Sequence, residues 1–168
     1  NNIGELSFYS DYTSTNKVDT SVFVDGLEHN KIVFINGRIE KIDFDYEKKN
    51  QIEIIDQSET INKISNNSLS DLNNAFTNKS FKIYVKKGYK LNKPLIIYHT
   101  TNPKIWSKNV NLKLDFELGE NSSLRVIDLF NDTSEKNFLN IFYSFDLKEN
   151  ASLKNYKIDK FENQNIKY

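Results

Sequence analysis

The chain has 168 residues, of which 38% are hydrophobic, 13% aromatic and 27% charged. Its 23 Lys and Arg residues balance its 23 Asp and Glu residues, and a formal net charge of zero argues against a nucleic-acid partner. The sequence has no cysteine, which excludes disulfides, thiolate nucleophiles and Cys-ligated metal centres. No apolar run approaches the roughly 20 residues that a membrane-spanning helix needs, so no membrane span is predicted.

The first residues carry no recognisable targeting signal. The opening NNIGELSFYS lacks the basic and apolar regions of an export signal, so we expect a cytoplasmic protein. Methionine is absent from the sequence, and residue 1 is therefore expected to follow a processed or longer N-terminal part. Residues 1–28 are polar with short apolar pairs, a pattern that predicts short strands or irregular structure.

Residues 31–46 predict a β-hairpin. The sequence KIVFINGRIEKIDFDY places Asn36-Gly37 between two arms rich in β-forming residues. Asn-Gly is the preferred pair for a two-residue type I′ turn, because both turn positions need a positive φ. The second arm alternates polar and apolar residues, with one slip near Lys41.

Residues 68–76 predict one short helix. Ser68 can cap it, and an acidic residue follows three positions later, as in a capping box. Leu69, Leu72 and Phe76 recur at helical spacing. Beyond this helix every apolar run is strand-like, and turns rich in Gly, Asn or Lys separate the runs.

An internal repeat is the most informative feature of the sequence. FELGENSSLR (116–125) aligns with FDLKENASLK (145–154) without a gap, so that Phe116 matches Phe145 and all later positions keep the same offset. Upstream, the segment around Gly88 has the same strand–turn–strand pattern, with Val85 corresponding to Leu118. The apolar positions before the two later turns also correspond, Leu112, Leu114, Phe116 and Leu118 matching Ile141, Tyr143, Phe145 and Leu147.

A period of about 30 residues with two strands per unit is typical of a solenoid, because each unit buries its apolar face only against the next. Asn121 and Asn150 stand at equivalent turn positions, where asparagine tolerates a left-handed backbone. We therefore predict a mainly β protein, with right-handed parallel β-helix coils over 80–168 after a small α+β region over 1–79. The coils are expected to continue in a longer protein or to be covered by a partner.

The sequence offers no catalytic or metal-binding constellation. It contains no Walker A loop, dinucleotide fingerprint, nucleophile elbow or HExxH motif. We interpret His99, at the end of a predicted strand, as a partly buried residue satisfied by backbone groups, and His29 as a loop residue. No ligand spacing supports a metal. We predict no catalytic, cofactor-binding or metal-binding residue in this chain.

The charged residues of the repeat are interpreted as solvated. Lys113, Asp115 and Glu117 alternate with the apolar positions of one strand, which predicts that they face away from the core. The same interpretation covers the later charges of strands and turns, which are Arg125, Asp128, Lys154, Lys157, Glu120 and Glu149. Trp106, the only tryptophan, is expected to pack under the loop between two coils.

Several segments together resemble the SufD family. KIVFINGR (31–38), LSDLNNAF (69–76) and FKIYVKKGYKLNKPLIIYH (81–99) stand in the order and spacing of that family. LGENSSLRVID and LKENASLKNYKID resemble its first β-helix coils, so the resemblance covers residue 31 to the end. The short loop after PLIIYH favours SufD over its paralogue SufB. SufD is the scaffold subunit of the SUF complex, which assembles iron–sulfur clusters.

The resemblance implies a cytoplasmic, non-catalytic scaffold that pairs with a SufB-type subunit through stacked β-helices and with a SufC-type ATPase. The assembled complex would handle the iron–sulfur cluster, and this chain would bind no cofactor itself. The family's implicated histidine and its SufC-binding segment correspond to positions beyond residue 168, so no site residue carries over. An uncovered coil edge also favours a homodimer formed through β-helix edges.

Two other functions remain as alternatives for a β-solenoid. A carbohydrate-active β-helix enzyme would need paired carboxylates or calcium-binding acids along one groove. The acids of this chain are dispersed and matched by lysines, which argues against that function. A free-standing binding or adhesion module is the other alternative, and the absence of cysteine and of a visible export signal argues against an extracellular one.

Overall fold

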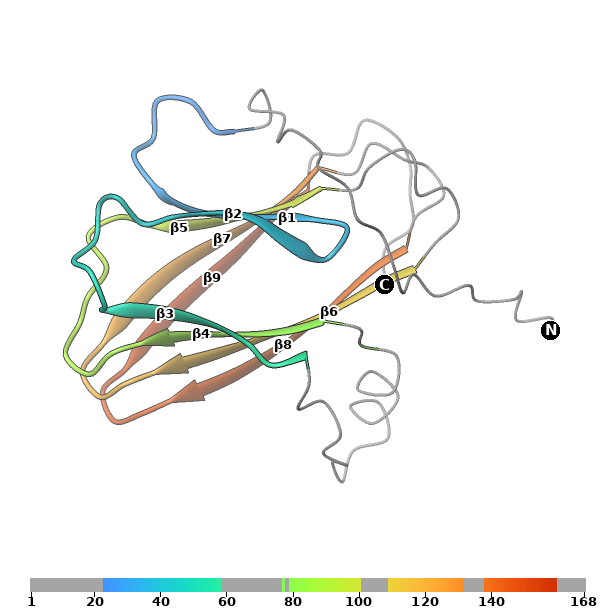
Figure 1. The fold of residues 1–168 in the computed structure, drawn as a ribbon. Helices are drawn as coiled ribbons and strands as arrows, with labels where there is room; N and C mark the ends of the chain where they lie inside the picture. The colour runs from blue at the N-terminus through green and yellow to red at the C-terminus, as the bar shows by residue number, and fades with distance from the viewer. Residues whose placement is uncertain (1–22, 59–76, 78, 101–108, 132–137, 160–168) are drawn as a thin grey trace.

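The computed structural model describes residues 23–58, 77, 79–100, 109–131 and 138–159. Its strands are β1 (Asn30–Ile35), β2 (Arg38–Asp43), β3 (Ile52–Asp56), β4 (Lys79–Val85), β5 (Leu95–Thr100), β6 (Asn109–Leu118), β7 (Ser123–Asn131), β8 (Phe138–Leu147) and β9 (Ser152–Asp159). They form a five-stranded sheet in the order β2-β1-β5-β7-β9 and a four-stranded sheet in the order β3-β4-β6-β8. Figure 1 shows the two sheets facing each other, joined along one side by turns. The expectation of a mainly β protein is confirmed.

Both sheets are mixed. β2 runs antiparallel to β1, and β3 runs antiparallel to β4, whereas all the other neighbouring strands are parallel. An antiparallel strand therefore closes one end of each sheet, and β8 and β9 form the opposite ends. Within the part of the chain that the structure describes, β8 and β9 each have a strand neighbour on one side only. We call these two strands the β8–β9 edge.

The repeat seen in the sequence sets the register of the parallel pairs. β6 pairs with β8 in the register Leu118↔Leu147, and β7 pairs with β9 in the register Leu124↔Leu153, so both pairs keep the offset of the sequence repeat. β4 pairs with β6 in the register Val85↔Leu118, which is the correspondence expected for the upstream unit. The alignment predicted from the sequence is confirmed strand by strand.

The turns between the sheets stack in the same way. Gly88, Asn121 and Asn150 occupy equivalent turn positions, with φ values of 74°, 57° and 54°. The amide of Gly88 donates to the carbonyl of Glu120 at 2.7 Å, and the amide of Asn121 donates to the carbonyl of Glu149 at 2.9 Å. The left-handed conformation predicted for the two asparagines is confirmed.

The hairpin predicted over 31–46 is present as β1 and β2. Asn36 and Gly37 have φ values of 54° and 74°, as a type I′ turn requires. The slip in alternation near Lys41 is a register shift in the β1–β2 pairing. Because β1 also pairs with β5 in parallel, the hairpin belongs to the larger sheet.

The remaining predictions for the N-terminal region are only partly covered by the structure. The short helix predicted over 68–76 lies outside the described residues, as does residue 106. In the described part of the chain, no helix has the length and apolar character needed to cross a membrane. β1 and β3 belong to the same two sheets as the coils expected over 80–168. The division into an α+β region over 1–79 and coils after it stays a prediction.

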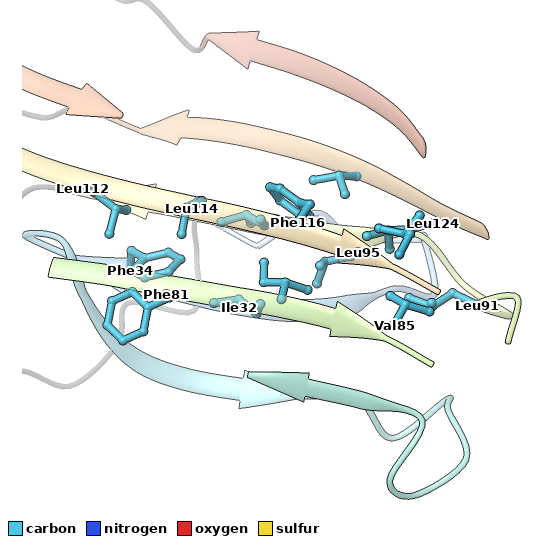
Figure 2. Close-up of a cluster of buried hydrophobic side chains, with 14 residues drawn as sticks. Ile32, Phe34, Phe81, Val85, Leu91, Leu95, Leu112, Leu114, Phe116 and Leu124 are labelled. Carbon is cyan, nitrogen blue, oxygen red and sulfur yellow. The ribbon is translucent and has the colours of Figure 1, made fainter. Parts of the chain in front are cut away.

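The main core lies between the sheets. Inward side chains from both sheets form one buried cluster, shown in Figure 2. On β6 this cluster takes every second residue, and the predicted inward positions Leu112, Leu114, Phe116 and Leu118 are at most 1% exposed. Burial of apolar surface stabilises a fold by roughly 25 cal/mol per Å². The stacking of inward rows is therefore the main source of stability.

A second buried cluster covers the outer face of the five-stranded sheet, and it contains Val33, Ile96, Tyr98 and Leu129. Phe23 packs on Tyr98 with ring centroids 4.9 Å apart, and the Val24 amide donates to the Tyr98 hydroxyl at 3.1 Å. The Nε2 atom of His29 lies 2.8 Å from the same hydroxyl. β1, β5 and the second half of β7 are consequently largely buried on both faces, so these segments show little polar–apolar alternation.

The Glu47 carboxylate ties the segment after the hairpin to the turn between β4 and β5. Its Oε1 accepts hydrogen bonds from Asn30 Nδ2 at 2.8 Å and from the Lys93 amide at 3.1 Å. Its Oε2 accepts from the Tyr89 hydroxyl at 2.7 Å and from the Asn92 amide at 3.1 Å. Burial alone would raise the pKa of Glu47, but these hydrogen bonds outweigh it and hold the pKa below its ordinary value.

We predict that Gly119→Ala destabilises the fold through a steric clash at the β6–β7 turn. A Cβ atom at this position would lie 2.5 Å from the Lys87 backbone nitrogen, which must then move. We expect a loss of about 1–3 kcal/mol in the free energy of unfolding, measured by urea denaturation. Lys148→Ala, one repeat later, is the matched control and should cost less than about 1 kcal/mol. Equal losses in the two variants would show that the close turn contact does not matter.

We predict that Glu47→Gln lowers stability by about 1–3 kcal/mol at neutral pH, because a neutral amide accepts these hydrogen bonds less strongly. The pKa of Glu47 is depressed on folding from a reference of 4.5, so its contribution is present above that pH. It is lost as the pH falls through the lower pKa of the folded state. Urea denaturation between pH 7 and pH 3 should therefore show the two proteins converging in acid. The exposed Glu53→Gln variant should show no such convergence.

Candidate functional site: the β8–β9 edge

Four large apolar side chains are exposed on the β8–β9 edge, namely Phe145 (48%), Leu147 (44%), Tyr156 (55%) and Ile158 (46%). The first two lie in register with buried residues of β6, so they belong to the inner layer between the sheets. The other two lie in register with residues of β7 that pack in the outer cluster. The edge thus exposes both apolar layers at the point where the described strands end.

Aromatic stacking holds the inner layer of this edge in place. The rings of Phe116 and Phe145 lie 5.6 Å apart at an interplanar angle of 20°. The ring of Tyr143 lies 6.3 Å from that of Phe145 at an angle of 6°. Such pairs add about 0.5–1.5 kcal/mol to the burial of their area. The edge is therefore a preformed surface.

A buried His–Asp pair lies just behind the edge. Nε2 of His99 lies 3.0 Å from Oδ1 of Asp128, and the two residues are 1% and 0% exposed. The imidazole is stacked between the rings of Phe34 and Phe130, at centroid distances of 5.5 and 4.8 Å. The expectation that backbone groups satisfy a partly buried His99 is wrong. His99 is almost fully buried, and the carboxyl group of Asp128 on the neighbouring strand β7 is its partner.

Two side chains of β8 and β9 extend this polar group toward the edge. Burial and the proximity of the Asp128 carboxyl raise the pKa of Tyr143 far above its ordinary value. The Tyr143 hydroxyl and the Asp128 Oδ2 atom are both buried, and hydrogen bonding to the Asp128 carboxyl contributes to the raised pKa of Tyr143. The ammonium group of Lys157 lies over the Tyr143 ring, 4.7 Å from its centroid. A row of polar groups therefore runs from His99 through Asp128 to Lys157.

The interpretation of the later strand charges as solvated holds only in part. Arg125 and Lys154 are exposed, as expected. Asp128 is fully buried between the sheets, which corrects the interpretation of this residue as part of a solvated face. Lys157 is exposed, but it lies in register with Asp128 and contacts the Tyr143 ring on the inner side. Leu124 and Val126 of β7 face the inner core, so the two-residue period of the strand places Asp128 on the inward side as well.

The charges on β6 face away from the core, as predicted, but they are partly buried. Nζ of Lys113 lies 3.4 Å from Oδ2 of Asp115, at side-chain exposures of 25% and 18%. Nζ of Lys82 lies 2.8 Å from Oε2 of Glu117, and this hydrogen bond raises the pKa of Lys82. These residues form ion pairs across and along strands, which is a structural role.

The remaining singled-out residues also have structural positions. Glu120 lies in the β6–β7 turn, where it forms an ion pair with Lys87, and Glu149 lies in the exposed β8–β9 turn. His29 lies before β1 as expected, but it is only 3% exposed. Burial lowers the pKa of His29 below its ordinary value.

The buried His–Asp pair is closed to solvent. The His–Asp pair has the geometry of a base and its orienting carboxyl group, but a substrate in solvent cannot reach two residues that are at most 1% exposed. Among the described ranges, no three side chains of His, Asp or Glu group closely enough to hold a metal ion. The β8–β9 edge presents apolar surface and, within the described residues, strand backbone with no neighbouring strand on one side.

Sequence analysis missed three residues that shape this surface. Tyr143 was identified only as an apolar position, and Asn155 was not singled out, although its buried Oδ1 atom has no hydrogen-bond partner among the described residues. Lys157 was assigned to the wrong face. The constant register between successive units was the available signal, because it aligns Asn155 with the inward Val126 and Lys157 with Asp128.

We predict that Asp128→Leu lowers the free energy of unfolding by about 2–4 kcal/mol, because it leaves the buried imidazole of His99 without its partner. The outward Arg125→Gln change on the same strand should cost less than about 0.5 kcal/mol. Combining Asp128→Leu with His99→Leu should recover part of the loss, since both polar groups are then removed. Urea denaturation of these three variants and of His99→Leu alone measures these values. Strict additivity of the two leucine substitutions would contradict a coupled pair.

Comparisons with known proteins add no identity to this surface. No protein-family model matches the sequence, and no curated protein is significantly similar to it. The resemblance to the SufD family therefore depends on its own short segments, at 31–38, 69–76 and 81–99 and in the two aligned turns. Any function has to be argued from those segments together with the geometry of the sheets and of the β8–β9 edge.

Proposed function

We propose that the described strands are the first coils of a right-handed parallel β-helix. The constant offset between paired strands in both sheets supports this, because it makes each strand–turn–strand unit stack on the one before. Equivalent left-handed turn residues at Gly88, Asn121 and Asn150 support it further. Right-handed crossovers are nearly universal for parallel strands within one sheet.

We further propose that this protein is a non-catalytic scaffold subunit of iron–sulfur cluster assembly, similar to SufD. It would act in the cytoplasm, pairing with a SufB-type subunit and a SufC-type ATPase. Two of the segments that carry the resemblance, 31–38 and 81–99, supply most of β1 and of β4 and nearly all of β5, which share one core. The chain has no cysteine, so thiolate ligands for a cluster would come from a partner.

The single observation that carries the scaffold role is the β8–β9 edge. Among the described strands it has no neighbour on one side, it exposes apolar side chains from both layers, and ring stacking fixes the position of the inner layer. A contiguous exposed apolar surface of this kind marks an interaction site in soluble proteins. Such a subunit works by geometry, because it holds the partner's residues in a fixed place.

The acids of the described strands and turns fit a scaffold better than a carbohydrate-active enzyme. Two of them form separate ion pairs with lysines, Glu120 with Lys87 and Glu117 with Lys82. The buried Asp128 is committed to His99. Hydrolysis of a glycosidic bond needs two carboxyl groups facing one substrate, roughly 5–9.5 Å apart.

The test is co-purification of the chain with an affinity-tagged SufB-type subunit from the same source, followed by size-exclusion chromatography with light scattering. We expect a stoichiometric complex that Phe145→Glu weakens at least about tenfold, because a charge is placed in the inner layer of the edge. Ile42→Glu, at the opposite end of the five-stranded sheet, is the matched control, since Ile42 is 46% exposed. It should leave the complex intact.

Two results would contradict the proposal. One is a well-folded native chain that forms no complex. The other is a complex that Phe145→Glu leaves unchanged, which would move the interface away from the β8–β9 edge. Circular dichroism and thermal melting of each variant separate a lost interface from a lost fold.

A further inference from the structure

Residues 23–29, which we call the N-terminal strap, lie against the outer cluster of the five-stranded sheet and are the blue segment before β1 in Figure 1. Phe23 and Val24 pack on that cluster, and the ring of His29 lies 5.9 Å from the ring of Tyr98. Between these two ends the strap turns outward at Gly26, whose φ is 74°, and residues 25–28 are exposed. Both ends of the strap therefore meet at one buried side chain, Tyr98 of β5.

Hydrogen bonds through the Tyr98 hydroxyl join the two ends. Its oxygen accepts from the Val24 amide at 3.1 Å, and Nε2 of His29 lies 2.8 Å from it. Nδ1 of His29 lies 2.5 Å from the carbonyl oxygen of Leu27, which can only accept, so Nδ1 carries the ring proton. Nε2 of the neutral ring is then an acceptor, and the Tyr98 hydroxyl donates to it. Neutral His29 thus completes a chain of hydrogen bonds from Val24 to Leu27.

A second proton on His29 does not fit this chain. It would lie on Nε2 and point at the Tyr98 hydroxyl, so two hydrogens would meet across 2.8 Å unless the hydroxyl turned its own hydrogen away. The phenol oxygen would then accept from both Nε2 and the Val24 amide, and the charged ring would stay buried at 3% exposure. A displaced hydroxyl hydrogen and a buried charge both favour an open strap.

The groups that face His29 do not remove this penalty. Burial is the largest influence on the ring, and it lowers the pKa of His29 below its ordinary value of 6.5 although the hydrogen bond to Leu27 favours the proton. The charge of Lys31 also opposes a positive ring. Asp43 favours a positive ring, but it is paired with Lys31 at 3.6 Å.

The other ionisable groups beside the strap do not take over its titration. Burial raises the pKa of Tyr98, so the phenol keeps its proton at neutral pH. Asp25 is the charge that acts on this phenol, and Glu28 forms an ion pair with Lys93 at 2.6 Å. Among the side-chain types of the strap, histidine is the one that ordinarily changes its charge between pH 5 and pH 8.

We propose that the N-terminal strap is an acid-sensitive switch, in which a proton on Nε2 of His29 breaks the contact with Tyr98 and releases the strap from the outer cluster. Closure is strongest above the ordinary histidine pKa of 6.5, because both forms of the strap then hold a neutral ring. It weakens as the pH falls below 6.5, until the pH reaches the lower pKa of the closed strap. Release uncovers apolar side chains of the outer cluster, including Tyr98, in mild acid. This inference does not depend on the proposed scaffold function.

The test is NMR spectroscopy of the full ¹⁵N-labelled chain between pH 7.5 and pH 5.5. The ring-nitrogen shifts of His29 report its tautomer and its titration. Hydrogen exchange at the Val24 amide, corrected for the intrinsic rate at each pH, reports opening of the strap. We expect the Nδ1–H tautomer, a pKa below 6.5, and a fall of up to about tenfold in Val24 protection, since only the open strap takes the proton freely.

Three variants assign the effect. His29→Gln keeps a neutral acceptor near Tyr98, so its Val24 protection should be equal at the two pH values. Tyr98→Phe keeps the ring that packs on Phe23 but removes the hydroxyl, so its Val24 amide should be weakly protected throughout. His99→Gln changes the other of the two histidines and is the matched control, which should retain the tenfold fall. Thermal melting checks that each variant remains folded.

A dye that fluoresces on apolar surface gives a second readout. It should bind the native chain more strongly at pH 5.5 than at pH 7.5, because the strap then leaves the outer cluster. The His29→Gln variant should bind the dye equally at both pH values. If that variant fails to fold, Tyr98→Phe and the titration of the native chain decide.

Three results would overturn the proposal. The first is an Nε2–H tautomer of neutral His29, or a titration of this ring at or above pH 6.5. The second is a Val24 amide whose protection is the same at both pH values in the native chain, or falls equally in His29→Gln. The third is dye binding to the native chain that does not change with pH, which would show that the outer cluster stays covered.

Discussion

Every part of this structure depends on one constraint, which is that each strand must lie in register on the strand of the preceding unit. A parallel strand satisfies its backbone hydrogen bonds only through its neighbours, and an inward side chain is buried only when the same position is filled in the next unit. Leu118 is fully buried because Val85 and Leu147 lie on either side of it. Leu147 has a neighbour on one side only within the described strands, and it is 44% exposed. The degree of burial thus follows position along the stack.

The two ends of the stack differ in how they expose the backbone N–H and C=O groups of their edge strands. At the first end, β2 and β3 turn back antiparallel and carry charges, and the Glu47 carboxylate ties the adjoining segment to the β4–β5 turn. At the other end, β8 and β9 are the last strands that the structure describes, and they keep the parallel register and expose apolar side chains. The first device blocks further strand addition, whereas the second leaves the geometry for it intact. This asymmetry supports the proposal that recognition takes place at one end.

Local patterns in the sequence predicted those parts of the fold that local patterns control. Asn36-Gly37 identified the hairpin because a type I′ turn needs that backbone, and the strict alternation on β6 identified its inward face. The prediction of a solvated Asp128 was wrong, because the period of the strand places it inward with Val126 and its partner His99 comes from another strand, β5. Glu47 was invisible for another reason, since its donors come from β1 and from the β4–β5 turn, far away in the sequence. The existence of the candidate surface could be predicted from the sequence as an uncovered coil edge. Its side-chain chemistry could not, because the registers of the paired strands decide which side chains lie beside one another.

The stacking has a consequence for how the chain is made. Protein synthesis delivers the N-terminal strands first, and units of about 30 residues can fold as they emerge because most of their contacts are with the unit just completed. Each finished unit then acts as the template for the next, so the growing end passes repeatedly through a state like the present β8–β9 edge. Until the next unit arrives, this state offers unpaired backbone beside exposed aromatic rings, which favours aggregation of nascent chains. Lys154 and Arg125 lie at equivalent outward positions of successive strands. Their positive charges would oppose the association of nascent chains during synthesis.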